Sequence, residues 1–333
     1  MTILVTGATG FVGSAVVRKL LAEQKAVSVL ARPNSIRANL EGLNVTIREG
    51  DLTDQASLKT ALQGCDGLFH IAADYRLWTK DSNELYRNNV DGTRNLMQAA
   101  LASNVQRIVY TSSVATLGVF ADGRVSDEQT PVSLDDMIGH YKRSKYLAEQ
   151  VVDELVRSAG LPAVIVNPST PVGPRDIKPT PTGRLIYDAL REKIPAYVDT
   201  GLNIAHVDDV ANGHLLAYKK GAIGRRYILG GEDLSLQEIL TEVANYCGHK
   251  PPTIKLARQL VVPIALISQA WAHLTNGPEP RATIDGLKMS KKKMFFSSAR
   301  AIEELGYASR PAREAIHEAI DWFRGNQALM LRS

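Results

Sequence analysis

Two residues suited to acid–base chemistry, Tyr141 and Lys145, lie four positions apart in a segment with a helical pattern. Residues at this spacing project from the same face of a helix. A tyrosine with an ordinary pKa of ~10 is a poor acid–base catalyst near neutrality. A neighbouring ammonium stabilises the phenolate and lowers that pKa, which makes proton exchange with an alkoxide feasible. The spacing is common by chance, so on its own it indicates two exposed, non-catalytic residues more often than a catalytic pair.

Hydroxyl and amide side chains accompany this pair. Ser112 and Ser113 follow a predicted strand at 108–111, and hydroxyls at the carboxyl edge of a parallel strand face a ligand crevice. Ser113 can hold a substrate oxygen while Tyr141 exchanges its proton, whereas a hydroxyl that closes its own backbone turn fits Ser112 better. Asn89 lies in an otherwise buried helical pattern. It can hold a water in a proton relay or bond a neighbouring main chain, and the sequence alone favours the second.

Three glycines, Gly7, Gly10 and Gly13, follow the apolar run 3–5 and precede a helical pattern. Gly7 permits a tight turn, Gly10 lets the backbone approach a pyrophosphate, and Gly13 lets the helix pack close to the strand. The N-terminus of that helix offers unpaired N–H groups and a positive dipole end to an anion. The stretch predicts a phosphate cradle, which also contains Thr9, Phe11 and Val12.

The end of the second predicted strand decides the type of dinucleotide, because the side chain there meets the adenosine ribose. Segment 29–35 contains no Asp or Glu, which would bind the ribose 2′-hydroxyl and favour NAD. In its place Arg32 can stack on the adenine and pair with a 2′-phosphate, with Arg37 in support. The other interpretation of Arg32 is a solvated loop cation. The prediction is NADP(H), with NAD as the alternative.

Further cofactor contacts are predicted at the ends of other strands. Asp51 can accept from the adenine amino group, although an Asx turn before the next helix is about equally plausible. Small side chains at Ala72 and Ala73 suit a cofactor that lies against the backbone, and they also suit ordinary close packing. The remaining predicted contacts are Leu52, Thr111 and Pro168.

Apolar runs separated by helical stretches predict the fold of this 333-residue chain. The predicted strands are 3–5, 27–31, 45–48, 68–72, 108–111 and 163–166, with long helices at 83–102 and 137–157. This alternation is typical of an α/β protein with a Rossmann, doubly wound parallel sheet. A proline-rich loop then leaves the sheet, and later segments predict a turn and helix at 206–211, a strand at 227–229 and mostly helix beyond 234. We expect a dinucleotide-binding domain at 1–168 and 203–231 and a smaller, mostly helical substrate-binding lobe at 169–202 and 232–333.

Composition excludes several classes of protein. Hydrophobic residues make up 44% and charged residues 22%, as in ordinary globular chains. A net charge of +4 is too small and dispersed to predict nucleic-acid binding. The two cysteines, Cys65 and Cys247, have no metal-ligand spacing, so we expect reduced thiols and no metal. No signal peptide is evident. We expect a cytoplasmic, soluble protein.

Two stretches raise the question of a membrane. Residues 260–274 are apolar, but they are broken by Pro263 and too short for a span, which takes ~20 residues. Residues 288–296 combine lysines with two phenylalanines and could touch an anionic surface. A buried helix explains the first stretch equally well, and a solvated run of charges explains the second. The sequence therefore predicts no transmembrane segment and leaves peripheral membrane contact open.

The combined motifs resemble a known superfamily over nearly the whole chain. They are Thr6-Gly7-x-x-Gly10-x-x-Gly13, Asp51, Asn89, Thr111-Ser112-Ser113, Tyr141-x-x-x-Lys145 and Asn167-Pro168. Together they resemble the extended short-chain dehydrogenase/reductases, the superfamily of NAD-dependent epimerases and dehydratases. Within it the chain looks like the dihydroflavonol-reductase-like branch. Segments 73–78, 111–118 and 203–210 are similar to hopanoid-associated sugar epimerases.

The resemblance implies roles for individual residues. Ser113, Tyr141 and Lys145 would be catalytic with Asn89 as a fourth member, and Lys145 would also hold the nicotinamide ribose. Asp51 becomes an adenine ligand, and the region of Pro168 meets the carboxamide. A homodimer through helices 83–102 and 137–157 is also expected. Loops above the pocket predict substrate contacts at Tyr75, Trp78, Arg175, Arg184 and His206, although His206 fits a structural role better.

Three functions follow as hypotheses. The first is an NADP-dependent oxidoreductase acting on a carbonyl or alcohol, linked through the resemblance to hopanoid side-chain metabolism. The second is a nucleotide-sugar epimerase that retains NAD, and the third is a non-catalytic dinucleotide sensor. Epimerases of this superfamily usually place an acidic residue where this chain has Arg32. That departure favours net reduction, and the intact Ser113, Tyr141 and Lys145 disfavour a sensor.

Overall fold

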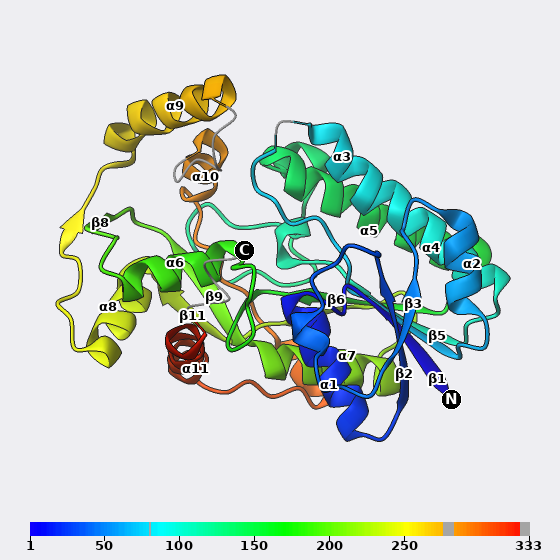
Figure 1. The fold of residues 1–333 in the computed structure, drawn as a ribbon. Helices are drawn as coiled ribbons and strands as arrows, with labels where there is room; N and C mark the ends of the chain where they lie inside the picture. Colours follow the sequence, from blue (N-terminus) through cyan, green and yellow to red (C-terminus); the bar gives the residue numbers. More distant parts are fainter. Residues whose placement is uncertain (80, 276–282, 327–333) are drawn as a thin grey trace.

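A seven-stranded parallel sheet forms the centre of the molecule. The computed structural model describes residues 1–79, 81–275 and 283–326 (Figure 1). The strand order is β10-β6-β5-β4-β1-β2-β3, and every neighbouring pair runs parallel. The strands are β1 (Thr2–Thr6), β2 (Ala26–Ala31), β3 (Thr46–Glu49), β4 (Gly67–His70), β5 (Arg107–Thr111), β6 (Ala163–Pro168) and β10 (Arg226–Leu229).

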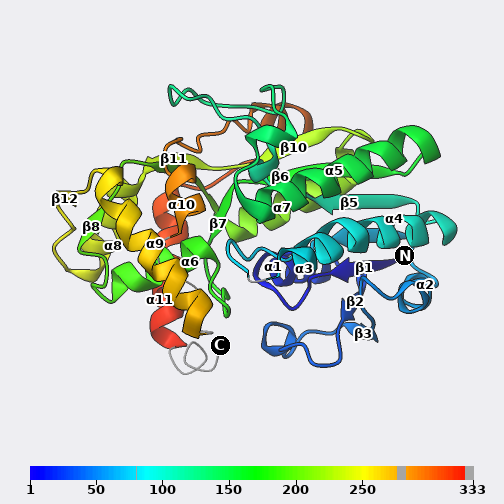
Figure 2. The ribbon, with the colours of Figure 1, turned by 90° about the horizontal axis from the view of Figure 1, so that it is seen from above.

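Helices cover both faces of this sheet (Figures 1 and 2). In β1, Ile3 and Val5 pack into one hydrophobic core, and Leu4 packs into the other. Because successive side chains of a strand point to opposite faces, a strand buried on both sides needs an unbroken apolar run. The first core contains α1 (Phe11–Ala22) and α7 (Val207–Lys220), and the second contains α2 (Gln55–Leu62), α4 (Gly92–Ala102) and α5 (Gly139–Ala159).

The chain reverses its winding direction beside β1, which pairs with β2 on one side and β4 on the other. Ligands of doubly wound folds bind at this switch point, outside the carboxyl ends of the strands. The predicted doubly wound sheet with a smaller second lobe is confirmed.

The second lobe contains two small sheets and several helices (Figure 2). One sheet has the order β11-β9-β7 and the other pairs β12 with β8. The strands are β7 (Thr170–Val172), β8 (Ala196–Tyr197), β9 (Gly201–His206), β11 (Glu232–Ser235) and β12 (Ile254–Lys255). The helices are α6 (Pro181–Leu190), α8 (Leu236–Cys247), α9 (Arg258–Thr275), α10 (Ile284–Met289) and α11 (Ala312–Gly325). A third core joins α6, α8 and α11 to β7 and β9.

Two local predictions are wrong, and one strand was missed. The strand expected at 68–72 ends at His70, two residues earlier. The helix expected at 83–102 is divided into α3 (Ser82–Tyr86), a π-helical segment at Arg87–Asp91 and α4. Strand β9 was not predicted, whereas the helix predicted to open at 206–211 is α7, with His206 as its N-cap.

Two further features concern the predicted membrane contact and metal. Within the described ranges, no helix is long and apolar enough to cross a membrane. The same part of the chain contains no cluster of three His, Cys, Asp or Glu side chains placed to hold a metal ion. Both cysteines are free thiols.

Candidate active site

The glycine turn between β1 and α1 has the geometry of a phosphate cradle. Gly7 has a φ of +71°, which favours glycine, and its carbonyl accepts from the N–H of Gly10 at 3.0 Å. A Cβ on Gly13 would lie 2.0 Å from that carbonyl oxygen, so only glycine fits. Gly10 caps α1 without a side-chain hydrogen bond, so the first-turn N–H groups remain available to an anion. The residues present therefore fit the pyrophosphate of a nicotinamide dinucleotide.

A buried histidine fixes the loop that faces this cradle. The hydroxyl of Thr6 accepts from the main-chain N–H groups of Ile71 and Ala72, both at 3.2 Å, and lies 2.8 Å from Nδ1 of His70. Nε2 of His70 lies 3.0 Å from the hydroxyl of Thr93. Burial, with a smaller effect of the Lys145 charge, lowers the pKa of His70 to about 3, so the ring is neutral. Sequence reasoning missed His70, although a polar residue that ends an apolar strand is a usable signal.

Tyr141 and Ser113 meet at the carboxyl end of β5. The Ser113 side chain, on the turn after β5, lies near enough to the hydroxyl of Tyr141, in the first turn of α5, to affect its ionisation. Burial raises the pKa of Tyr141, the negative charge of Asp74 adds to the rise, and the Ser113 side chain opposes it. The phenol is therefore protonated at neutral pH, as a proton donor must be.

Lys145 has different partners from those expected. Its Nζ donates to the carbonyl oxygen of Thr111 at 2.9 Å and to the hydroxyl of Tyr110 at 3.4 Å. Burial lowers the pKa of Lys145 to about 8, although the nearby carboxylate of Glu149 opposes this. The pKa of the Tyr141 phenol is raised and the Lys145 ammonium bonds β5, so the lowering of that pKa by Lys145 stays a prediction.

The serine that closes a backbone turn after β5 is Ser113 and not, as was expected, Ser112. Ser113 accepts from the N–H of Ala115 at 3.1 Å. Ser112 instead donates to the carboxylate of Glu149. That buried carboxylate also accepts from Asn167 at 3.1 Å and pairs with Arg226 at 2.7 Å. Glu149 therefore links α5, β6 and β10 below the site, a role that no sequence motif indicated.

The side chain of Asn89 forms hydrogen bonds with the main chain and is not free to hold a water in a proton relay. Its Oδ1 accepts from the N–H of Asp74 at 2.7 Å, and its Nδ2 donates to the Asp74 carbonyl at 2.9 Å and to Ser144 at 2.9 Å. This agrees with the main-chain role that the sequence favoured. Asp74 pairs in turn with Arg76. Asn89 thus positions the loop after β4 beside Tyr141.

The adenosine side of the cradle contains Asp51, Arg32 and Arg37. Asp51 accepts from the N–H and hydroxyl of Thr53 at 2.8 and 2.7 Å, which is an Asx turn. Burial works against its ionisation, but these bonds and the positive charge of Arg32 outweigh burial, so the pKa of Asp51 lies below its ordinary value. Arg32 is exposed at the end of β2, whereas Arg37 pairs with Glu49 at 2.9 Å. Arg32 is therefore the cation available to a ligand at this edge.

Tyr75 and Trp78 lie on the loop after β4, and their contact with a substrate stays a prediction. The hydroxyl of Tyr75 donates to the Lys178 carbonyl at 3.3 Å, which joins this loop to the one before α6. Burial, with the charges of Asp176 and Asp74, raises the pKa of Tyr75 to about 12. Arg184 is exposed on α6.

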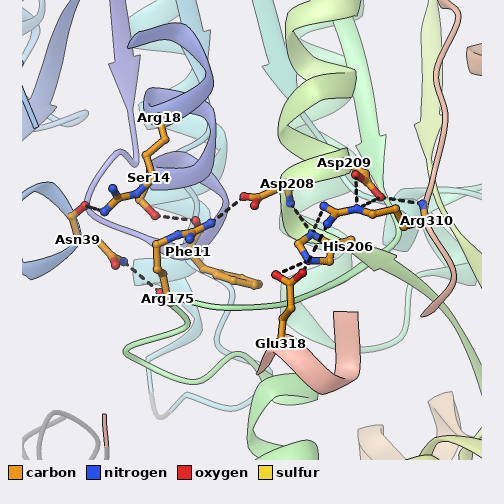
Figure 3. A network of polar contacts seen from close by, with 10 residues as sticks. All are labelled: Phe11, Ser14, Arg18, Asn39, Arg175, His206, Asp208, Asp209, Arg310 and Glu318. Atoms are coloured by element: carbon orange, nitrogen blue, oxygen red, sulfur yellow. Dashed lines mark hydrogen bonds and ion pairs between the residues drawn. The ribbon is translucent and has the colours of Figure 1, made fainter. Parts of the chain in front are cut away.

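Arg175 and His206 take part in the contacts that join the two lobes (Figure 3). Arg175 pairs with Asp208 at 2.6 Å, and its carbonyl accepts from Asn39 at 3.2 Å; Asn39 also donates to the carbonyl of Thr9 in the cradle. The ring of His206 is fully buried and lies 3.0 Å from Glu318. Its Nδ1 accepts from the N–H of Asp208 at 3.0 Å and caps α7.

Comparisons with known proteins identify the family of the chain. The profile of the NAD dependent epimerase/dehydratase family matches residues 3–230. A putative dihydroflavonol 4-reductase from Synechocystis sp. is 45% identical over 97% of this chain and 94% of its own, and sterol demethylase protein B from Methylococcus capsulatus is 36% identical over 97% and 98%. The crystal structure of gox2253 is 55% identical, covers 97% of this chain and 98% of its own, and superposes with a TM-score of 0.88. The chain belongs to the NAD-dependent epimerase/dehydratase family.

Proposed function

We propose that the protein is an NADP(H)-dependent reductase of a carbonyl group, with Tyr141 as the proton donor. The feature that supports this most directly is the placement of Ser113 near the Tyr141 phenol at the carboxyl end of β5, where burial raises the pKa of that phenol. A donor protonated at neutral pH suits the reductive direction, because a nascent alkoxide is far more basic than a phenolate.

Each residue has a defined part in this reaction. A bound dinucleotide would supply a hydride to the carbonyl carbon of the substrate. Ser113 orients the carbonyl oxygen, and Tyr141 donates its proton to that oxygen as negative charge develops. Lys145, whose ammonium bonds β5, would hold the nicotinamide ribose. Asn89 acts indirectly, by positioning the loop at Asp74.

The preference for NADP(H) rests on Arg32. Its charge is exposed at the end of β2 and acts on Asp51, so both lie where the adenosine of a dinucleotide would sit. An arginine there can pair with a 2′-phosphate, which NAD lacks. We further propose that residues 1–168 and 203–231 bind the dinucleotide, and that 169–202 and 232–333 bind a substrate with a large apolar part. A relative named for a sterol and the resemblance to hopanoid-associated proteins support a polycyclic lipid.

A nucleotide-sugar epimerase that retains NAD is the second candidate. The family name and the shared Ser113, Tyr141 and Lys145 support it, since one site can oxidise and then reduce the same carbon. Arg32 argues against it. A homodimer through α4 and α5 and a cytoplasmic location stay predictions.

The nucleotide itself provides the first test. Protein purified without added cofactor is denatured and its released nucleotide identified, and the affinities for NADPH and NADH are measured by titration calorimetry. We expect an empty site that prefers NADPH, and Arg32→Ala should reduce the ratio of the two affinities at least ~10-fold. Arg124→Ala, which removes an exposed arginine from a loop, is the matched control. Tightly held NAD in the wild type would reject the reductase.

Substitution of the proton donor provides the second test. With a carbonyl substrate found by screening for NADPH oxidation, Tyr141→Phe should lower kcat at least ~100-fold, because general acid catalysis supplies 10²–10⁴. The affinity for NADPH should change little. Tyr246→Phe, which alters a half-exposed tyrosine on α8, should leave both unchanged. Equal activity of Tyr141→Phe and the wild type would exclude the proposed chemistry.

A further inference from the structure

Helix α9 exposes a row of large apolar side chains at the edge of the small lobe. Leu260, Ile267 and Trp271 are 65%, 70% and 68% exposed, and their spacing of seven and four residues places them on one helical face. Leu266 adds a fourth side chain at 55%. From Gln259 to Thr275 the sequence contains no Asp, Glu, Lys or Arg. A helix that faces only water normally carries charged residues on its outer face. We therefore expect another molecule to cover the apolar face of α9.

The opposite face of α9 is attached to the protein. Ala265 is fully buried, and Gln269 accepts from the N–H of Ile284 at the start of α10. Arg258 donates to the carbonyl of Ser290 at 2.9 Å, which fixes the other end of the helix. Figure 1 shows α9 at the upper edge of this lobe, with α10 directly below it.

The residues around α9 are strongly basic. Segment 250–293 contains two acidic residues, Glu279 and Asp285, against a larger set of cations: Lys250, Lys255, Arg258, Arg281, Lys288, Lys291, Lys292 and Lys293. This excess exceeds the net charge of +4 for the whole chain, so the remainder is slightly acidic. The positive charge of the protein is therefore concentrated in the segment that contains its exposed apolar helix.

We infer that α9 docks the protein on the surface of an anionic lipid membrane. An apolar face with a tryptophan, next to exposed lysines, matches the surface that peripheral proteins insert among lipid headgroups. Lysines near such a surface add electrostatic attraction to anionic lipid. A second copy of the chain is a poorer covering, because pairing α9 across a two-fold axis would bring two basic segments together.

The position of α9 suggests what membrane docking would achieve, and this step rests on the function proposed above. Asp285 of α10 lies against Gly139, where a Cβ would be 3.2 Å from its Oδ2. Gly139 begins α5, two residues before Tyr141. A membrane beneath α9 would thus lie close to the catalytic end of α5. A lipid-like substrate could pass from the bilayer to the site with little exposure to water.

The test is vesicle flotation of the full chain without cofactor or substrate, so that it is independent of the proposed chemistry. We expect the wild type to float with vesicles of phosphatidylcholine and phosphatidylglycerol, and much less with phosphatidylcholine alone. Ile267→Glu/Trp271→Glu should lower the bound fraction about 10-fold, because it places charges in the contact. Lys288→Gln/Lys291→Gln should remove most of the preference for anionic vesicles.

The matched control is Ile223→Glu, which changes another exposed isoleucine, 55% exposed, in the turn before β10. It should float like the wild type. NADPH affinity and thermal unfolding verify that each variant is folded. Absence of wild-type binding, or unchanged binding of the α9 double variant, would overturn the inference. The inference would also be overturned if the wild type did not bind vesicles and light scattering showed it to be a dimer that the double variant abolishes.

Discussion

Lys145 and Tyr141 share one face of α5 but experience different environments. The ammonium bonds the carbonyl of Thr111 and the hydroxyl of Tyr110, in a site where burial penalises its charge. Glu149, one turn further along α5, partly restores the charged form. The phenol is held protonated by burial and by Asp74. Within the described site, Lys145 is therefore the member of the pair whose charge changes nearest to neutral pH.

The pH dependence of turnover should report this titration. The pKa of Lys145 is about 8, so its ammonium is present below that pH and is lost as pH rises through it. We expect kcat/KM for NADPH to fall above about pH 8, because kcat/KM reflects ionisations of the free enzyme. Lys145→Arg keeps a charge at every accessible pH, so its lower activity should not show this decline. A wild-type profile that stays level to pH 10 would contradict the assignment.

At the scale of single elements, the π-helical segment at Arg87–Asp91 explains how α3 and α4 serve the site. A π turn adds a residue to a helical turn and often marks a functional position. Here it contains Asn89, whose side chain is buried and holds both main-chain groups of Asp74. The helix thereby supports a loop that has no regular structure of its own.

Removal of this support should affect stability and catalysis together. Asn89→Ala leaves the main-chain N–H and carbonyl of Asp74 without the partners that Asn89 provides, so we expect a loss of ~2–3 kcal/mol in the free energy of unfolding. Displacement of the loop beside Tyr141 should lower kcat/KM at least ~10-fold. Urea unfolding and steady-state kinetics measure the two effects.

The neighbouring residue is a matched control for this change. Asn88 makes only a 3.5 Å contact with the carboxylate of Asp74, so Asn88→Ala should change the stability by less than ~0.5 kcal/mol. Similar losses in both variants would mean that the hydrogen bonds of Asn89 have no special role.

Elements with strong local patterns were predictable from the sequence, and those set by tertiary contacts were not. The buried strands of the large sheet are continuous apolar runs. The turn after β1 needs glycines at fixed spacing, and few other local structures do. Strand β9 escaped prediction because its pattern depends on pairing with β7 and β11. The roles of Ser112 and Lys145 depend on Glu149 and Tyr110, residues distant in sequence that no motif identifies.

At the scale of the whole molecule, a chain of ion pairs and hydrogen bonds joins the lobes (Figure 3). The loop before α6 reaches the cradle through the Arg175 carbonyl and Asn39, and reaches α7 through Asp208. His206 continues the chain, since it ends β9, caps α7 and lies against Glu318 of α11. Arg310 closes it by pairing with Asp209 at 3.0 Å and by donating to Nδ1 of His206 at 2.8 Å. The lobes thus share one polar interface beside the dinucleotide cradle.

His206 should consequently act on stability and not on the chemical step. Both ring nitrogens have partners. Nδ1 accepts from two donors, so the N–H of the ring is at Nε2 and points toward Glu318. We expect His206→Ala to lose ~2–4 kcal/mol in urea unfolding, because it removes a helix cap and leaves buried donors unpaired. For the fraction that remains folded, kcat and its pH profile should stay within about 3-fold of the wild type. Arg184→Ala, on the exposed face of α6, should change neither quantity. A stable His206→Ala protein with a lost pH dependence would instead identify His206 as a base in catalysis.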